Sequence, residues 1–349
     1  MPSIKILIVS HKPFKKPVGE YYVPIHAGRS VATEKSKDGR INPQDLDWML
    51  NNTIGDDSGD NISDKNRYYS ECSALYWAWK NYDKLDNPEY IGLMHYRRHF
   101  IFNNNYYDSQ LPDNWHRALC YINENFIDEN YQNKICLHDK EIQNACEKYD
   151  MVVSKDSQFD LINGYNIREN YEKTIPGVKV KDFDLMINII KKYYPQYSQV
   201  LDKNISGYKK SLYQMFLMRK DLFFEYCEFL FGVLFKIESQ INLKNYTTNG
   251  KRTLGYLAEI LLAVFVWQKE AEGLKLLKLG VTEIEYPYED ENIENILKMG
   301  KPSYKKYLSF KLKALFAKGK DKNSFKESYQ SLRRQIKSYK KLKSIYPTK

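Results

Sequence analysis

The sequence predicts a mixed α/β fold with a mostly parallel sheet flanked by helices. Short apolar runs at residues 4–10 and 91–94 show no polar alternation, which is typical of strands that are buried on both faces of a parallel sheet. Segments with apolar residues at helical spacing, such as residues 68–82 and 252–267, separate such runs along the chain. Both strand-like runs end in polar or cationic side chains, which is where open α/β sheets bind ligands.

Composition indicates a globular protein. The chain has 349 residues, of which 42% are hydrophobic, so it can bury a sizeable core as one α/β body with additions or as two domains. Five scattered cysteines include no CxxC pair, which argues against a disulfide framework or a structural zinc site and fits a reducing cytosol. We see no signal peptide and no apolar run of about 18 residues, so we expect a cytoplasmic protein, soluble or peripheral to the membrane.

The first third of the chain begins with the strand at residues 4–10, which ends in Ser10, His11 and Lys12. A loop rich in proline and glycine follows, with a short extended piece at residues 21–24. Residues 56–66 are dense in turn formers but lack the spacing of a calcium loop. We therefore expect a loop that leads into the helix at residues 68–82, with Ser63 or Asp64 as N-cap.

The segment at residues 90–102 combines an apolar run with a cluster of cationic side chains. Its apolar run stops at His95, Tyr96, Arg97 and Arg98, so two permanent cations and an imidazole sit where a strand leaves the sheet. This arrangement suits a phosphorylated substrate. The alternative is an ordinary strand end, with surface ion pairs and a core histidine, and the tetrapeptide alone does not decide between them.

The later elements are a strand at residues 149–154, a strand or strand–helix junction at 212–219, an apolar helix at 221–238 and a final strand region at 274–286. The helix at residues 252–267 is apolar except for a narrow stripe that carries Arg252, Tyr256 and Glu259. A carboxylate in such a place either pairs with Arg252 or acts as a proton acceptor near neutral pH.

Two Asp-x-Asp sequences raise the question of a divalent metal. They are Asp182-Phe183-Asp184 and Asp45-Leu46-Asp47. The first opens an apolar-periodic helix, and an aspartate at a helix start is ordinary capping, so we favour capping over metal binding at both.

The C-terminal segment differs in charge from the rest. Residues 301–349 hold 16 Lys and Arg against two acids, which leaves 38 basic and 42 acidic side chains in residues 1–300. Apolar residues recur at helical spacing from residue 304 to 316 with lysines between them, and a second basic helix is expected at residues 325–345. Such helices suit an anionic membrane surface, while nucleic-acid binding and a solvated tail are the alternatives.

Several motifs occur together in an order that is more specific than any one of them. They are SHKP at residues 10–13, YYVPIHAG at 21–28, DDSGDNISDKN at 56–66, ECSALYWAWKN at 71–81, YIGLMHYRRHF at 90–100, YQMFLMRKDLFFEYCEFLF at 213–231 and RTLGYLAEILL at 252–262. In this order the chain resembles the bacterial capsular and exopolysaccharide glycosyltransferases that include galactofuranosyltransferases. The resemblance covers roughly residues 4–290 and leaves the basic tail outside.

The resemblance implies a GT-A-like fold, with a Rossmann-type nucleotide-binding half, in residues 1–300 and a basic amphipathic helical tail in residues 301–349. It implies transfer of a sugar from a nucleotide-sugar donor, UDP-linked and with galactofuranose as a candidate sugar, to a saccharide or lipid-linked acceptor. The His95–Arg98 segment occupies the place where related folds carry a metal-binding DxD, which puts dependence on Mn²⁺ or Mg²⁺ in doubt. Arginines can neutralise a diphosphate leaving group instead.

The resulting hypothesis is an inverting displacement in which Glu259 deprotonates the acceptor while Arg97 and Arg98 stabilise the departing diphosphate. The tail would hold the enzyme at the inner face of the cell membrane, and no nucleic acid is expected as a partner. The rival hypothesis is a nucleic-acid-binding protein that acts through its basic tail, and a third possibility is a non-catalytic saccharide-binding module, which would not depend on Glu259. The expected donor-binding residues are Ser10, His11, Lys12, Asp64, Lys65, Asn66, His95, Tyr96 and Arg252.

Overall fold

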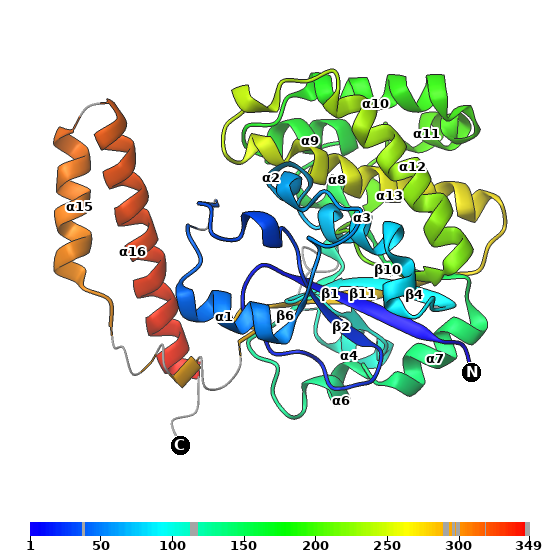
Figure 1. Cartoon of the computed structure of the whole chain (residues 1–349), viewed down its shortest axis with the longest axis horizontal. Coiled ribbons are helices and arrows are strands. Elements are labelled where there is room, and N and C mark those ends of the chain that lie inside the picture. The colour runs from blue at the N-terminus through cyan, green and yellow to red at the C-terminus, as the bar shows by residue number, and fades with distance from the viewer. Residues whose placement is uncertain are drawn as a thin grey trace. The chain divides into compact units, whose positions relative to one another are not determined.

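The computed structural model describes residues 1–36, 39–111, 118–288, 293–294, 297, 301–317 and 319–345. These residues form two compact units, Met1–Pro287 and Tyr288–Lys349 (Figure 1).

The first unit is built on one large sheet. Among the described residues nine strands join in the order β3-β2-β1-β4-β10-β7-β11-β5, and β6 also pairs with β11. Most neighbours are parallel, whereas β10 runs antiparallel to β4 and β7, and β5 antiparallel to β11. The strands are β1 (Ile4–Ser10), β2 (Tyr22–His26), β3 (Ile54–Gly55), β4 (Tyr90–His95), β5 (Phe100–Ile101), β6 (Tyr121–Glu124), β7 (Met151–Ser154), β10 (Phe216–Arg219) and β11 (Leu276–Ile284), with β8 (Asp156–Gln158) and β9 (Lys209–Ser211) forming a separate pair.

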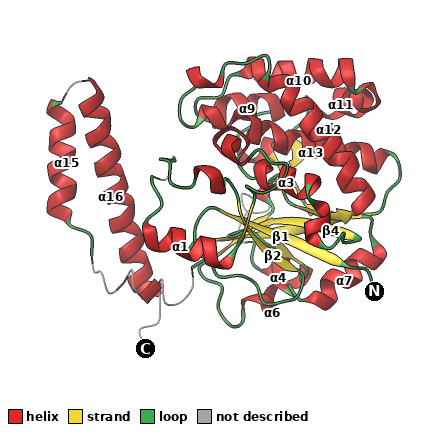
Figure 2. Cartoon of the chain, viewed as in Figure 1, coloured by secondary structure: helices red, strands yellow, loops and turns green. Residues whose placement is uncertain are grey.

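Helices cover both faces of the sheet (Figure 2). Alternate side chains of β1 point to opposite faces of the sheet, and both sets are apolar. Leu7 and Val9 belong to one buried cluster, and Ile6 and Ile8 belong to the other. The first cluster contains residues of α3, α10, α12 and α13, and the second contains residues of α6 and α7. The prediction of a mixed α/β fold with a mostly parallel sheet is confirmed. The helices of this unit are α1 (Pro43–Asn52), α2 (Asn66–Tyr69), α3 (Cys72–Lys80), α4 (Asn104–Ser109), α6 (Tyr131–Ile135), α7 (Asp139–Lys148), α8 (Phe159–Ile162), α9 (Ile167–Thr174), α10 (Val180–Tyr193), α11 (Ser198–Asn204), α12 (Lys220–Glu238) and α13 (Thr253–Ala271).

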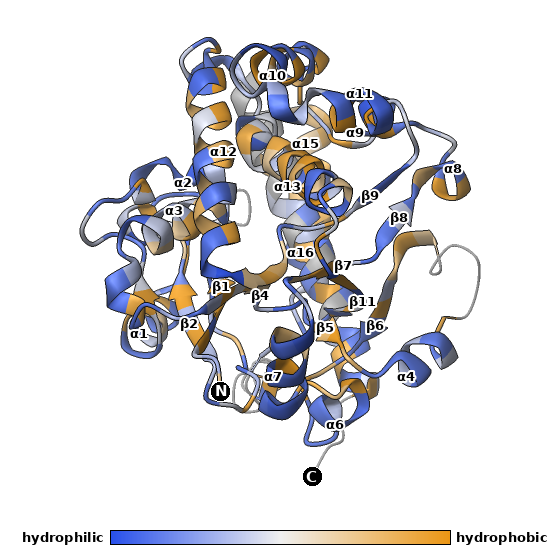
Figure 3. Cartoon of the chain, turned by 90° about the vertical axis from the view of Figure 1, so that its right-hand side faces the viewer, coloured by the Kyte–Doolittle hydropathy of each residue, from blue (hydrophilic) through white to orange (hydrophobic). Residues whose placement is uncertain are grey.

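α13 is a buried helix that is apolar nearly all round. Between Thr253 and Trp267, Tyr256 and Glu259 alone are not fully buried. By contrast, α10 and α12 mix hydrophilic and hydrophobic colours along their length in Figure 3, as helices with one buried and one exposed face do. The carboxylate of Glu259 therefore reaches solvent through a narrow break in an apolar surface.

The helix predicted at residues 68–82 is divided, and the predicted N-cap is wrong. α2 ends at Tyr69 and α3 begins at Cys72, because Ser70 adopts a φ of 53° that ends the first helix. Ser63 is not a helix cap but donates its hydroxyl to Asp56 at 2.5 Å, inside a 3-10 turn at Ser63–Lys65. The buried Asp56 carboxylate accepts further bonds from two backbone N–H groups and the Ser73 hydroxyl, which fixes the loop.

β1 and β4 form the topological switch point of the sheet. The two strands are parallel neighbours, but the chain continues from β1 to β2 on one side and from β4 toward β5 on the other. Ligands of open α/β sheets bind in the crevice that such a divergence creates at the carboxyl ends of the strands.

The second unit contains a pair of helices, α15 (Tyr304–Phe316) and α16 (Gly319–Ile345). α15 is predicted from the sequence, and α16 begins six residues before its predicted start. Within the described residues, no helix has the length and apolar character needed to cross a membrane.

Candidate active site

The turn after β4 is held by backbone bonds from two strands. Tyr96 donates its N–H to Val9 of β1 at 3.1 Å, and Ile284 at the end of β11 donates to the carbonyl of Arg97 at 2.9 Å. A further bond from the Arg98 N–H to the His95 carbonyl, at 3.1 Å, closes the turn. The two arginines therefore start from a fixed backbone at the switch point.

Arg98 lies between an acid and an aromatic ring. Its guanidinium donates two bonds to Glu283 at 3.3 and 3.1 Å and stacks 4.3 Å from the centre of the Tyr213 ring. Burial alone would lower the pKa of Arg98, but the charges of Glu283 and Glu259 and the Tyr213 hydroxyl raise it overall. Arg97 shares the same acid at 3.9 Å, and its side chain is 42% exposed, so it is the more accessible cation.

His95 is a neutral imidazole at this position. Burial is the main cause that holds its pKa well below the usual value, followed by the charges of Arg98 and Arg97. Its Nε2 atom is buried and has no hydrogen-bond partner among the described residues. A ring nitrogen without a partner can donate a hydrogen bond to a bound substrate or accept one from it, depending on the tautomer.

Glu259 has a cationic partner other than the one considered from the sequence. Lys210 of β9 places its Nζ 3.7 Å from the Glu259 carboxylate, whereas Arg252 bonds to Ser70 at 3.1 Å and to Tyr256 at 3.4 Å. Burial lowers the pKa of Lys210, although the neighbouring Glu259 opposes that shift. The Lys210 side chain is 7% exposed and that of Glu259 is 28% exposed, so the acid is the accessible member of the pair.

Glu71 is a second carboxylate that interacts electrostatically with Glu259. Burial raises the pKa of Glu71, and the charge of Glu259 raises it further, while Arg252 and Arg98 oppose both effects. Glu71 directly follows Ser70, whose unusual backbone separates α2 from α3. The break between these helices therefore places an acid beside the charged groups of β4 and α13.

These groups form one electrostatic cluster, because each of them either changes the pKa of another member or has its own pKa changed by one. The sequence predictions Arg98, His95, Glu259 and Arg252 are all members. We call the set the active-site cluster, and it consists of Glu71, His95, Arg98, Lys210, Tyr213, Arg252, Glu259 and Glu283.

Four members of the cluster were missed from the sequence. Tyr213 takes a φ of 67°, rare for an aromatic residue, and precedes β10. Lys210 lies beside Lys209 in a polar stretch that gives no sign of burial. Glu71 directly before a helix and Glu283 within the last strand were visible, but nothing in the sequence relates them to residues so far away along the chain.

A pocket with a volume of about 160 Å³ lies beyond the carboxyl ends of β1 and β2. The rings of His11 and Tyr96 pack edge to face with their centres 5.7 Å apart, and the Nζ of Lys12 lies 5.4 Å from the centre of the Tyr96 ring. Tyr96 therefore connects the pocket with the turn after β4. Three permanent cations outnumber the two acids in the lining, which consists of His11, Lys12, His26, Ala27, Gly28, Ala32, Glu34, Ser36, Gly39, Arg40, Ile41, Asn42, Asp45 and Arg67.

Four other residues predicted to bind the donor, Ser10, Asp64, Lys65 and Asn66, are not part of the lining of this pocket. Ser10 is buried and its hydroxyl donates to the Lys12 carbonyl at 2.6 Å, which shapes the start of the loop. Asn66 touches the space beside Gly28, where a φ of +73° and the lack of room both require glycine. Lys65 pairs with Glu238 of α12 at 3.0 Å, and Asp64 is exposed.

Neither Asp-x-Asp sequence offers converging carboxylates. Asp182 is buried and accepts the Tyr246 hydroxyl at 2.9 and 2.8 Å, so the prediction that it caps a helix is wrong. Asp184 pairs with Arg168 at 2.8 Å, and Asp45 lies in the first turn of α1, where Asn42 is the N-cap. No cluster of three or more metal-ligating side chains occurs in the described part of the chain.

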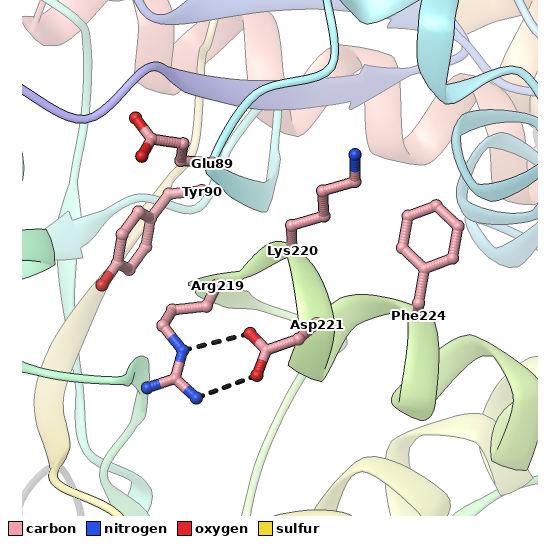
Figure 4. Close-up of a pocket in the computed structure, with 6 residues that line it drawn as sticks. All are labelled: Glu89, Tyr90, Arg219, Lys220, Asp221 and Phe224. Atoms are coloured by element: carbon pink, nitrogen blue, oxygen red, sulfur yellow. Dashed lines mark hydrogen bonds and ion pairs between the residues drawn. The ribbon is translucent and has the colours of Figure 1, made fainter.

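A larger hollow of about 620 Å³ lies at the opposite edge of the sheet, at the start of β4 and the end of β10 (Figure 4). Arg219 donates two bonds to Asp221 at 3.1 and 2.9 Å and a third to Asp150. Lys220 lies over the rings of Tyr82 and Phe224. Arg219 is therefore already paired with two acids, and this hollow lies at the other end of β4 from the switch point.

Comparisons with known proteins agree with this architecture. An apo structure of the bifunctional glycosyltransferase WbbM is similar, with a TM-score of 0.67 and 30% sequence identity over 81% of this chain. That match covers 45% of the WbbM chain, so this protein spans less than half of its length. None of the curated proteins is significantly similar. The model of the family described as "Domain of unknown function (DUF4422)" matches residues 5–270, and since this is most of the chain, the protein belongs to that family.

Proposed function

We propose that this protein is a glycosyltransferase that moves a sugar from a nucleotide diphosphate donor to an acceptor hydroxyl. One observation carries the proposal. Glu259, an accessible acid on a buried helix, lies in the same electrostatic cluster as Arg98, at the carboxyl end of the strand beside the switch point. A base for the acceptor and cations for a diphosphate are the two groups that such a transfer needs.

The donor would bind across the switch point. The nucleoside fits the pocket beyond β1 and β2, where Lys12, Arg40 and Arg67 contribute positive charge. Tyr96 continues this surface to Arg97 and Arg98, which would receive the diphosphate. Arg97 is the more accessible of the two, so it would contact the diphosphate directly, while Glu283 would compete with the diphosphate for Arg98.

The chemical step is a displacement at the anomeric carbon. Glu259 accepts the proton of the acceptor hydroxyl as its oxygen bonds to that carbon, and the bond to the diphosphate oxygen breaks on the opposite face. The nucleoside diphosphate leaves with the electron pair, and the configuration is inverted. Lys210 keeps the Glu259 carboxylate oriented toward the cluster.

The similarity to WbbM, a bifunctional glycosyltransferase, supports glycosyl transfer. We further propose a UDP-linked donor, with galactofuranose as the first sugar to test, and a saccharide or lipid-linked acceptor in the synthesis of a capsule, exopolysaccharide or O-antigen. These details follow the resemblance of the sequence motifs. No three metal-ligating side chains converge in the described part of the chain, and the nucleotide-sugar panel below includes Mg²⁺ and Mn²⁺ to test whether the donor binds together with a cation.

Ligand binding and turnover test the proposal separately. We expect UDP and a UDP-sugar to raise the melting temperature, since a ligand that binds the folded form at 100 times its Kd stabilises it by about 2.7 kcal/mol. Glu259→Gln should lower turnover by about 10² to 10⁴-fold, because the base is lost, while the shift with UDP persists.

A matched control lies on the same helix. Glu270→Gln also removes a carboxylate from α13, but Glu270 is exposed and pairs with Lys278, so turnover should stay at the level of the unmodified protein. Full turnover by Glu259→Gln would remove the base assignment. If a panel of nucleotide sugars, with and without Mg²⁺ or Mn²⁺, gave no shift at all, the whole proposal would fail.

A further inference from the structure

The α15 helix carries two apolar stripes. One faces α16, where Tyr307 lies 6.2 Å from Tyr329 and Phe310 lies 6.2 Å from Phe325, measured between ring centres. Ala314 is buried on the same side. At 100° per residue these three positions of α15 lie within about 60° of one another. This stripe holds the two helices together.

The second stripe points away from α16. Its members range from 39% exposed at Leu308 to 83% exposed at Phe316, and they occupy an arc of roughly 120° that is centred about 140° from the first stripe. Five large apolar side chains gathered on one exposed helix face are unusual for a protein surface and mark a binding surface. We call this set the outward stripe of α15, and it consists of Tyr304, Leu308, Leu312, Leu315 and Phe316.

Lysines surround the outward stripe. Lys305 and Lys311 are exposed at its borders, and α15 contains no acidic residue. The whole of residues 301–349 has 16 basic and two acidic side chains, a net charge of +14. An occupant of this surface therefore has to be apolar beneath and negatively charged around the edge.

An anionic lipid surface meets both conditions. A second copy of the chain would bring two segments of charge +14 together, which opposes self-association. Nucleic acid would match the charge, but leucines gain little from a phosphate backbone. Acyl chains bury leucine and phenylalanine favourably, and each cation near an anionic bilayer adds to the attraction.

We infer that the outward stripe of α15 docks on anionic lipid bilayers, with its apolar side chains below the headgroups and its lysines at the level of the phosphates. The inference does not rest on glycosyl transfer. Combined with it, the stripe would hold the enzyme at the inner face of the cell membrane, close to lipid-linked acceptors.

Vesicle sedimentation of the full chain tests the inference. The unmodified protein should bind vesicles that contain phosphatidylglycerol and bind pure phosphatidylcholine much more weakly. Leu312→Ser combined with Leu315→Ser keeps every charge and should weaken binding by about tenfold or more for each leucine. Lys305→Gln and Lys311→Gln should each weaken binding by about fivefold.

The matched control changes an exposed leucine outside this helix. Leu161 of α8 is 57% exposed, and Leu161→Ser should leave vesicle binding unchanged. Helicity measured by circular dichroism establishes that the variants keep their fold. As a second measurement, Phe316→Trp should report quenching by brominated lipids beyond that of the five native tryptophans.

Four outcomes would overturn the inference, and the last of them would favour the nucleic-acid hypothesis. The first is unchanged binding by the double leucine variant, and the second is the absence of added quenching at position 316. The third is a dimer in solution that this double variant dissociates, which would make the stripe a contact between copies. The fourth is retention on RNA in place of vesicles, with a steep dependence on salt.

Discussion

The two edges of the central sheet both hold an arginine paired with an acid, but among the described residues only one of them also holds an acid and a lysine whose pKa values burial shifts toward the neutral form. At the edge shown in Figure 4, hydrogen bonds between Arg219 and Asp221 raise the pKa of the arginine and lower the pKa of the acid. Both shifts favour the charged forms. In the active-site cluster burial raises the pKa of Glu71 and lowers the pKa of His95 and Lys210, and these shifts favour neutral forms.

The comparison shows that the size of a hollow does not identify the site. The opposite edge has the larger volume, yet its ion pairs are satisfied and open to solvent. Charged groups held where burial penalises them cost folding free energy, and they persist in proteins mainly where chemistry uses them. The cluster at the switch point has this property.

Removing an arginine from each edge tests the comparison most strongly. Arg98→Ala should lower turnover by about 10² to 10³-fold, because the diphosphate loses a cation in a water-poor site. Arg219→Ala removes the same group from the opposite edge, so it should leave turnover unchanged and cost stability by about 1 kcal/mol. Steady-state kinetics and urea unfolding measure the two effects.

Arg98→Ala also leaves Glu283 without its main partner, so loss of activity has to be separated from loss of fold. Arg98→Ala with Glu283→Gln removes both charges and should recover stability but not turnover. Equal loss of turnover in the Arg98 and Arg219 variants would contradict the contrast between the edges.

The coupling of the two carboxylates gives a smaller effect, on the titration of Glu71. Glu259→Gln removes a negative charge that, together with burial, raises the pKa of Glu71. The pKa of Glu71, followed through its carboxyl resonance by NMR, should therefore fall in this variant. An unchanged pKa would show that the two carboxylates do not interact.

Lys210 provides a second test of the same variant. Burial lowers the pKa of Lys210 and the Glu259 carboxylate opposes that shift, so Glu259→Gln should lower the pKa of Lys210 further. NMR of labelled lysine side chains measures this pKa, and an unchanged value would contradict the ion pair.

A last test concerns the fold and not the rate, and uses His26, which is buried in the lining of the pocket of about 160 Å³. Burial, with the charges of Arg29 and His11, lowers the pKa of His26 to about 4. In the unfolded chain the imidazole of His26 is protonated below about pH 6.5. The free energy of unfolding is therefore unaffected by His26 above that pH, and it falls by about 1.4 kcal/mol per pH unit between about pH 6.5 and pH 4. Urea unfolding between pH 5 and 6.5 measures how the free energy of unfolding depends on pH, and this dependence should be weaker in His26→Gln than in the unmodified protein. An unchanged dependence would contradict the assignment to His26.

Much of the fold follows from local sequence patterns. The run at residues 4–10 is a strand over the same residues, and the helices at 221–238 and 252–267 are found within a few residues of their predicted ends. The break at Ser70 could not be predicted, because no proline or glycine marks it in the sequence. The φ of Ser70 is instead accompanied by a hydrogen bond from Arg252, which is distant along the chain. α1 lies in a stretch too polar to give a clear periodic signal.

The candidate site is only partly visible in the sequence for a related reason. Arg97, Arg98 and Glu259 stand out, because polar residues interrupt apolar runs at these positions. Lys210 and Tyr213 do not, since their importance comes from burial and from an unusual backbone conformation. The roles assigned to all of them remain predictions until the variants are measured.

The position of β11 has a practical consequence for truncated proteins. The segment that matches the family model ends at residue 270, but β11 begins at Leu276 and pairs with β5, β6 and β7. A protein shortened to the matched segment would lack an interior strand, the backbone bond to Arg97 and the acid that holds Arg98. Any expression boundary should therefore lie beyond Ile284, and an insoluble product from a shorter one would say nothing about activity.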